Sequence, residues 1–178
     1  LSPIGYVFVG LFLLMASLFF YSEVLVTGST MFSNIFYSLS TILIMIVPLL
    51  TMRTFSEERK DGTEQLLLTA PRSVTSIVLG KFFAALIVLL IAVVLTFIYY
   101  IILMFLGNPN IKTSLVTVFG FILLGAALIS FGMFASSITE NQVIAAIVSI
   151  AFYVITWIGT PYLSQSLEPL GLMNMFNR

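Results

Sequence analysis

Between its charged residues this chain has four long uncharged stretches, and they constrain the fold more than any other feature. They cover residues 24–52, 82–111, 113–139 and 141–167. Each is long enough to cross a bilayer once, because a membrane-spanning helix needs ~20 mainly apolar residues. Charged residues make up 8% of the 178 positions, against roughly 25% in a soluble domain. We therefore predict an all-α membrane protein, built as a polytopic helical bundle.

Turn residues divide the apolar sequence into five helices. We expect Gly159-Thr160-Pro161 to end the last helix, because Gly and Pro are typical of helix ends. The first apolar run has no basic residues before it, so we interpret it as a span and not as a secretory signal. Because the sequence starts at Leu1 instead of Met, we expect it to be part of a longer polypeptide. The predicted spans cover residues 4–21, 34–52, 76–106, 114–134 and 141–160.

Charged residues concentrate between the second and third predicted spans. Residues 53–81 hold four of the seven acidic and five of the seven basic residues. Lys and Arg close to span ends are retained on the cytoplasmic side. We therefore expect residues 53–75, called the charged loop below, to be cytoplasmic together with the Thr139-Glu140 turn. The Gly107 turn and the tail at residues 161–178 would then be external.

The charged loop contains two patterns typical of helix starts. The pairs are Thr54 with Glu57, and Asp61 with Glu64. At this spacing, the side-chain oxygen of the first residue accepts a hydrogen bond from the amide of the acid, and the acid side chain accepts one from the amide of the first residue. We expect two short helices separated by a turn at Gly62. Lying at the membrane surface, such helices can bury leucines toward the spans and expose their charges to a docking protein. The first helix would carry Glu57, Glu58, Arg59 and Lys60, and the second Leu66, Leu67 and Leu68 up to Pro71.

Small residues recur along one side of the fourth predicted helix, and again in the fifth. At a spacing of four, they allow helix backbones to approach closely in lipid. Our preferred interpretation is packing within one subunit, and a contact between subunits is the alternative. The residues expected to mediate this packing are Gly125, Ser130, Gly132, Ser136, Ala145 and Ser149.

Several classes of chemistry lack the residues they need in this sequence. Cysteine and histidine are both absent, which removes thiolate nucleophiles, imidazole bases and the usual zinc or haem ligands. We therefore predict no catalytic residue and no metal site. The net charge is zero and the sequence has no stripe of basic residues, so we expect no electrostatic attraction to nucleic acid. No ionisable side chain falls near the middle of a predicted span, which argues against a proton-coupled pump.

The sequence also lacks a phosphate-binding loop of the Gly-x-x-x-x-Gly-Lys-[Ser/Thr] type. Gly80-Lys81 has no earlier Gly at the required spacing and is followed by Phe82. Any ATP that powers this protein must therefore be bound by another chain. The force that ATP hydrolysis generates would have to enter through the charged loop.

The charged loop resembles a known family. Its sequence Phe55-Ser-Glu-Glu-Arg-Lys-Asp-Gly-Thr-Glu-Gln-Leu-Leu-Leu-Thr-Ala-Pro-Arg-Ser73, followed by Ile77-Val-Leu-Gly-Lys-Phe82, is similar to the loop between the second and third spans of ABC-2 type transporter permeases. In particular, it is similar to the gliding-motility and copper-enzyme-maturation branch. The opening Ser2-Pro-Ile-Gly-Tyr-Val-Phe8 also resembles the start of the first span in that branch.

The resemblance implies a permease with six spans per subunit, of which this sequence shows five and no cytoplasmic N-terminal segment. It implies a bacterial cytoplasmic (inner) membrane location and a coupling helix that docks on a separate ABC ATPase subunit. Two permease subunits, as a homo- or heterodimer, would pair with two ATPases. ATP and Mg would be held by those partners, with no cofactor in this chain. By position, the resemblance assigns the docking role to Glu57, Glu58, Arg59, Gly62, Thr63, Glu64, Leu66, Leu67 and Pro71. Lys60 is included because it belongs to the same helix as Glu57. Gly80 and Lys81 match the base of the third span.

The leading hypothesis is therefore an export permease that moves an unidentified substrate with ATP hydrolysed by a subunit docked on residues 53–75. The alternative is a membrane anchor or scaffold of a motility or secretion complex that does not transport, since it would need the same docking helices. A membrane enzyme is a third class. It would need a nucleophile paired with a base, or carboxylates, within the spans, and the sequence places its acids at loops and helix ends.

Overall fold

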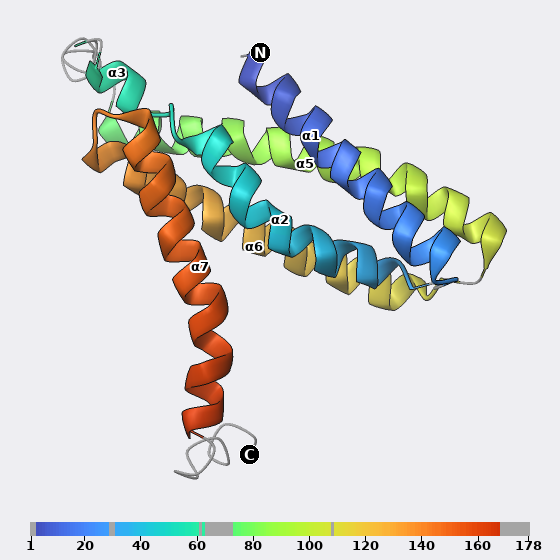
Figure 1. Ribbon diagram of the computed structural model, residues 1–178. Coiled ribbons are helices and arrows are strands. Elements are labelled where there is room, and N and C mark those ends of the chain that lie inside the picture. Colours follow the sequence, from blue (N-terminus) through green and yellow to red (C-terminus); the bar gives the residue numbers. More distant parts are fainter. Residues whose placement is uncertain (1–2, 29–30, 61, 63–72, 108, 168–178) are drawn as a thin grey trace.

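A computed structural model describes residues 3–28, 31–60, 62, 73–107 and 109–167, and within these ranges every regular element is a helix. The prediction of an all-α, polytopic membrane bundle is confirmed. Helix α1 continues into a π-helical segment, η1, and the very short α3 lies between two long helices (Figure 1). The bounds are Pro3–Phe20 for α1, Tyr21–Val26 for η1, Phe32–Thr51 for α2, Ser56–Lys60 for α3, Val74–Leu106 for α5, Ile111–Ile138 for α6 and Gln142–Leu167 for α7.

Four helical segments in the described part of the chain are long and apolar enough to cross a membrane. They are Ile4–Val26, Phe32–Lys60, Val74–Leu106 and Ile111–Ile138. The fifth predicted span corresponds to α7, whose described apolar segment, Gln142–Trp157, is shorter.

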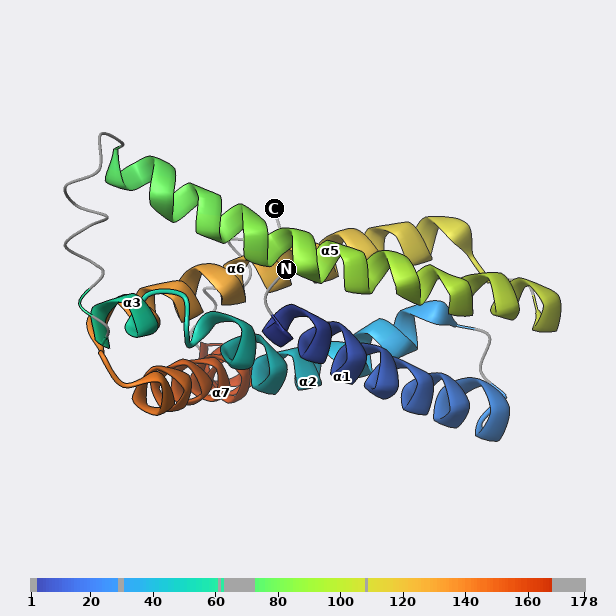
Figure 2. The same ribbon diagram turned by 90° about the horizontal axis from the view of Figure 1, so that it is seen from above.

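The long helices α1, α2, α5 and α6 lie side by side, and the chain runs back and forth along them (Figures 1 and 2). Helix α2 packs against α1 and α6, while α5 packs against α1 and α6 on the other side. Helix α7 contacts α2 and α6 and then diverges from the bundle. As a result, α3 and the turn between α6 and α7 share one end of the bundle, which we call the α3 end. The end of η1 with the start of α2, and the end of α5 with the start of α6, lie at the opposite end (Figure 1).

Aromatic rings fill the core between α1, α2, α5 and α6. The rings of Phe36 and Phe121 meet edge to face at 5.0 Å between centroids, and Phe12 adds a second contact to Phe121 at 5.9 Å. Phe32 meets Tyr100 of α5 at 5.0 Å. In lipid, helices gain little from hiding apolar surface, so close packing of such rings stabilises the bundle through dispersion and aromatic geometry.

Two glycines on one stripe of α6 bring neighbouring helices close. A Cβ added to Gly125 would lie 2.3 Å from Cδ2 of Leu89 on α5, and one added to Gly132 would lie 2.3 Å from Oγ1 of Thr51 on α2. Ser136 continues the same stripe and is buried, as are Ala145 and Ser149 on α7. These five predicted packing residues therefore lie at contacts within one chain.

Ser130 does not belong to this stripe, which corrects the expectation that the small residues share one side of the helix. Its side chain is exposed, and its hydroxyl donates to the carbonyl of Ala126 in its own helix at 2.9 Å. Five positions after Gly125, the helix has turned by roughly 140° beyond a full rotation, because each residue advances it by about 100°. Ser130 therefore points away from the stripe that contains Gly125.

Helix α7 also differs from prediction at its end, since it continues through Gly159 and Pro161 to Leu167. A proline fixes φ near the helical value and removes a single backbone donor, so a helix in an apolar setting can continue through it. Pro48 shows the same behaviour inside α2, where it is buried and the helix runs on to Thr51. Residues 161–167 are therefore helical, and the prediction that Gly159-Thr160-Pro161 ends the last helix is wrong.

Helix α6 is longer than the predicted span at both ends. It begins at Ile111 because the Asn110 side chain accepts hydrogen bonds from the amides of Lys112 and Thr113, at 3.1 and 3.4 Å. Asn is among the preferred residues for capping free amides at a helix start. The last turns of α6 reach Ile138, which brings Ser136 and Ser137 to the α3 end.

Candidate functional site

Helix α3, the part of the charged loop that the structure describes as helical, follows directly from the end of α2. It covers only five residues and ends at Lys60, and the amide of Gly62 beyond it donates to the carbonyl of Arg59 at 3.2 Å. Gly62 has φ = +69°, a left-handed conformation that glycine adopts without steric cost. The turn expected at Gly62 is therefore present.

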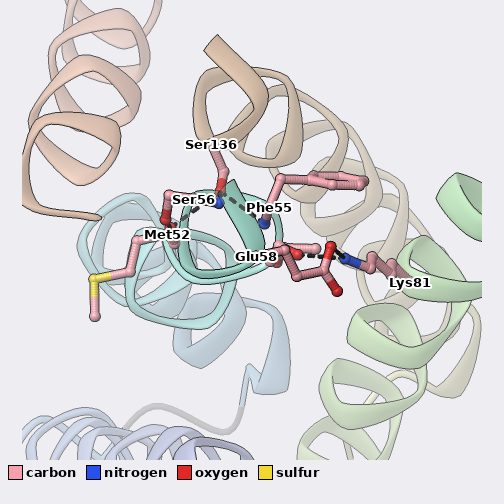
Figure 3. Close-up of polar contacts among 7 residues, drawn as sticks. Met52, Phe55, Ser56, Glu58, Lys81 and Ser136 are labelled. Atoms are coloured by element: carbon pink, nitrogen blue, oxygen red, sulfur yellow. Dashed lines mark hydrogen bonds and ion pairs between the residues drawn. The ribbon is translucent and has the colours of Figure 1, made fainter. Parts of the chain in front are cut away.

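A single hydroxyl from α6 caps the start of α3 (Figure 3). The Ser136 Oγ accepts hydrogen bonds from the amides of Phe55 and Ser56, both at 3.1 Å, and donates to the carbonyl of Met52 at 3.0 Å. The Ser56 hydroxyl also donates to Met52. Ser136 thus satisfies amides at a helix start and a carbonyl at a helix end, groups that are costly to bury without partners.

This cap replaces the one predicted within the charged loop. Thr54 and Glu57 were expected to cap the helix reciprocally, but the Thr54 amide donates to the Thr51 carbonyl at 3.0 Å. The amides that need a cap belong to Phe55 and Ser56. The end of α2 continues as turns through residue 55, which moves the start of α3 beyond the reach of the expected pattern.

Lys81 of α5 holds α3 from a second side (Figure 3). Its Nζ forms an ion pair with Glu58 and donates to the carbonyl of Thr54 at 2.6 Å. It also lies 4.2 Å from the centre of the Phe55 ring, within the range of a cation–π contact. The side chains of Lys81 and Glu58 are 21% and 31% exposed, so solvent screens this pair less than it would a fully exposed one.

Arg59 adds a third connection, because its Nη1 donates to the carbonyl of Ser137 at 2.9 Å. Helix α3 is therefore continuous with α2, tied to α5 through Lys81, and tied to α6 through Ser136 and Arg59.

The remaining charges of α3 face outward. Glu57 and Lys60 are exposed, as is Arg53 at the end of α2. Together with Glu140 and Gln142 from the turn between α6 and α7, these three side chains line an open cleft of about 480 Å³. The outward face of α3 therefore carries charges of both signs, whereas Glu58 and Arg59 contact the bundle.

Five of the predicted docking residues, Thr63, Glu64, Leu66, Leu67 and Pro71, lie outside the described residues, as does the second expected helix of the charged loop. In the described part of the chain, no group of three or more acidic, histidine or cysteine residues is arranged to hold a metal ion. Gly80 has open space around it and precedes Lys81 in the first turns of α5.

Sequence reasoning missed the capping role of Ser136 and the contact of the Ser137 carbonyl with Arg59. Ser136 was identified only as a small packing residue, because its hydrogen-bond partners lie about 80 positions away in the chain. One signal in the sequence could have indicated these contacts. Two serines stand in the last turn of α6, on the side of the membrane that was also predicted for the charged loop. A hydroxyl at that place can reach the polar groups of a neighbouring helix end.

Comparison with known proteins places this chain in a family. The family model described as "ABC-2 family transporter protein" matches residues 16–176, which is nearly the whole sequence. No curated protein and no solved structure matches the chain.

Proposed function

This chain belongs to the ABC-2 family of transporter proteins, and we propose that α3 is the element through which an ABC ATPase drives it. Members of this family are multi-pass membrane subunits that work with such an ATPase. We further propose that the chain is an export permease whose substrate is moved with ATP hydrolysed by the partner. The charged loop would then face the cytoplasm, where ATP is available.

The observation that carries the proposal is the way α3 is fixed. Its outward face offers Glu57 and Lys60 to a partner, and its inward contacts reach α2, α5 and α6 at the same time. A partner that pushes on an isolated, flexible loop would only bend the loop. A partner that pushes on α3 acts on three spanning helices, because the Ser136 cap, the ion pair to Lys81 and the hydrogen bond of Arg59 hold it against them.

Three finer parts of the expectation remain proposals. The family match is at the level of ABC-2 transporters, so the gliding-motility and copper-enzyme-maturation branch stays a prediction from sequence resemblance. The same holds for the pairing of two permease subunits with two ATPases, and for the inner-membrane location. The anchor or scaffold function has no specific observation in its favour.

The experiment that tests the proposal is ATP hydrolysis by the complex of this permease with its ATPase. We expect Glu57→Lys to reduce the hydrolysis stimulated by the permease, because it reverses an exposed charge on the outward face of α3. The matched control is Glu23→Lys, which makes the same change in η1 at the opposite end of the bundle. The control variant should retain full stimulation.

Two results would overturn the docking role. One is stimulation by Glu57→Lys equal to that of the unmodified chain while the variant inserts normally in the membrane. The other is a loss of stimulation in Glu23→Lys alone, which would place docking at the other end of the bundle. A complex that assembles through α3 but never turns over ATP in response to substrate would support the scaffold function.

A further inference from the structure

A second cavity at the α3 end combines charged and apolar walls. It has a volume of about 390 Å³ and lies between the start of α1, the end of α2, α3 and the first turns of α5. Its charged wall consists of Arg53, Glu57, Glu58 and Lys81, and its apolar wall includes Leu50 and Ala84. The proposed docking of an ATPase shares Glu57 with this cavity but makes no use of its apolar wall.

The two walls lie where a membrane changes from polar to apolar. Arg53 is the first charged residue after the uncharged run 24–52, and Lys81 is the last one before the run 82–111. These charges therefore lie at the level of lipid headgroups, where Lys and Arg side chains at helix ends extend. Leu50 and Ala84 lie one turn further into their spans, at the level of acyl chains. The cavity therefore has the polarity of a phospholipid, in the orientation a bilayer requires.

The charges of the cavity indicate the type of headgroup. Glu58 and Lys81 neutralise each other in an ion pair. Arg53 and Glu57 are exposed, and within the described part of the chain no ion pair joins them. One cation and one carboxylate are thus available to a ligand. A guanidinium binds phosphate oxygens through paired hydrogen bonds, and a carboxylate accepts hydrogen bonds from a primary ammonium.

From this arrangement we propose that the cavity binds a zwitterionic phospholipid with a primary amine, of the phosphatidylethanolamine class. Arg53 holds the phosphate, Glu57 accepts hydrogen bonds from the ammonium, and one acyl chain lies along Leu50 and Ala84. An anionic headgroup leaves Glu57 facing a negative charge. A choline headgroup has no N–H to donate to the carboxylate.

The test is native mass spectrometry of the full permease chain, purified in detergent and titrated separately with phosphatidylethanolamine, phosphatidylcholine and phosphatidylglycerol. We expect a single retained phosphatidylethanolamine, bound about tenfold more tightly than either other lipid, as loss of one charge-assisted hydrogen bond implies. Equal affinity for all three lipids, or a preference for phosphatidylglycerol, would overturn the assignment.

Charge variants test the two contacts separately. Arg53→Gln is expected to weaken phosphatidylethanolamine binding about tenfold, while Lys60→Gln, an exposed cation of α3 outside this cavity, leaves it unchanged. Glu57→Gln should remove the preference for phosphatidylethanolamine over phosphatidylcholine, with Glu140→Gln as its matched control. If the control variants reduce binding as much as the cavity variants do, the lipid is held by general surface charge and the site is refuted.

A third variant tests the apolar wall without altering charge. Ala84→Phe adds a ring at the exposed Ala84 position of the cavity and should abolish the retained lipid. Ala151→Phe makes the same change on the exposed side of α7, outside the cavity, and should not. Phosphoethanolamine is the soluble probe. If it binds as tightly as the lipid, the apolar wall contributes nothing and the lipid assignment is wrong.

Discussion

Gly132 of α6 lies so close to Thr51 of α2 that an added Cβ would be 2.3 Å from the threonine Oγ1 and 2.9 Å from its Cβ. The same Cβ would lie 3.0 Å from the hydroxyl of Tyr153 on α7. This contact joins α2, α6 and α7 at the last residue of α2, where the chain turns toward α3. The absence of a side chain at Gly132 is what allows α2 and α7 to pack on α6 at this level.

Gly132→Ala is therefore expected to destabilise the bundle. The new methyl group meets the branched carbon of Thr51, which cannot move aside without shifting α2, and overpacking of this kind costs about 1–3 kcal/mol. Thermal unfolding of the detergent-purified protein measures the effect. Gly120→Ala is the control, because it changes the same helix at a position with open space around it. If the two variants melt at the same temperature, the contact with Thr51 is not a constraint.

Ser136→Ala removes the hydroxyl that caps α3. The amides of Phe55 and Ser56 lose their acceptor, and a lost cap costs about 0.5–2 kcal/mol. We expect faster amide hydrogen exchange in residues 55–60, with little change in the central turns of α6. Ser137→Ala is the matched control, since that hydroxyl donates to Phe134 within its own helix. Unchanged exchange at residues 55–60 in Ser136→Ala would show that the cap does not hold α3.

The ion pair between Lys81 and Glu58 can be measured by a double-mutant cycle. Lys81→Met and Glu58→Gln each remove one partner and keep similar side-chain length. Because the pair is partly shielded from solvent, we expect a coupling energy of about 1 kcal/mol that decreases as salt is added. The free energy of unfolding of the two single variants and the double variant provides the value. A coupling energy of zero at low salt would remove α5 from the helices tied to α3.

Most of the fold could be predicted because the bilayer imposes it. A run of uncharged residues between charged ones leaves the backbone no way to satisfy its polar groups in lipid except as a helix. The positions of α2, α5 and α6 follow from that rule to within a few residues. The ends were less predictable, because Asn110 extends α6 backward and Pro161 does not stop α7.

The candidate site could be predicted only in part. The outward charges Glu57 and Lys60 and the turn at Gly62 follow from local patterns in the charged loop. The contacts that fix α3 do not, because Ser136, Ser137 and Lys81 lie far along the chain and meet α3 only after the helices pack. Ser130 was grouped with Gly125 by residue size, although the helical repeat places it on another face.

The measurement that tests the account most directly uses single cysteines, because these 178 residues contain none. Glu57→Cys and Lys112→Cys place one thiol at an exposed position at each end of the bundle. Membrane-impermeant maleimide should label Lys112→Cys from outside intact cells and Glu57→Cys only in inverted vesicles. In the assembled complex, a short bifunctional crosslinker should join Glu57→Cys, and not Lys112→Cys, to the ATPase. External labelling of Glu57→Cys, or crosslinking of the ATPase to Lys112→Cys instead, would contradict α3 as the coupling element.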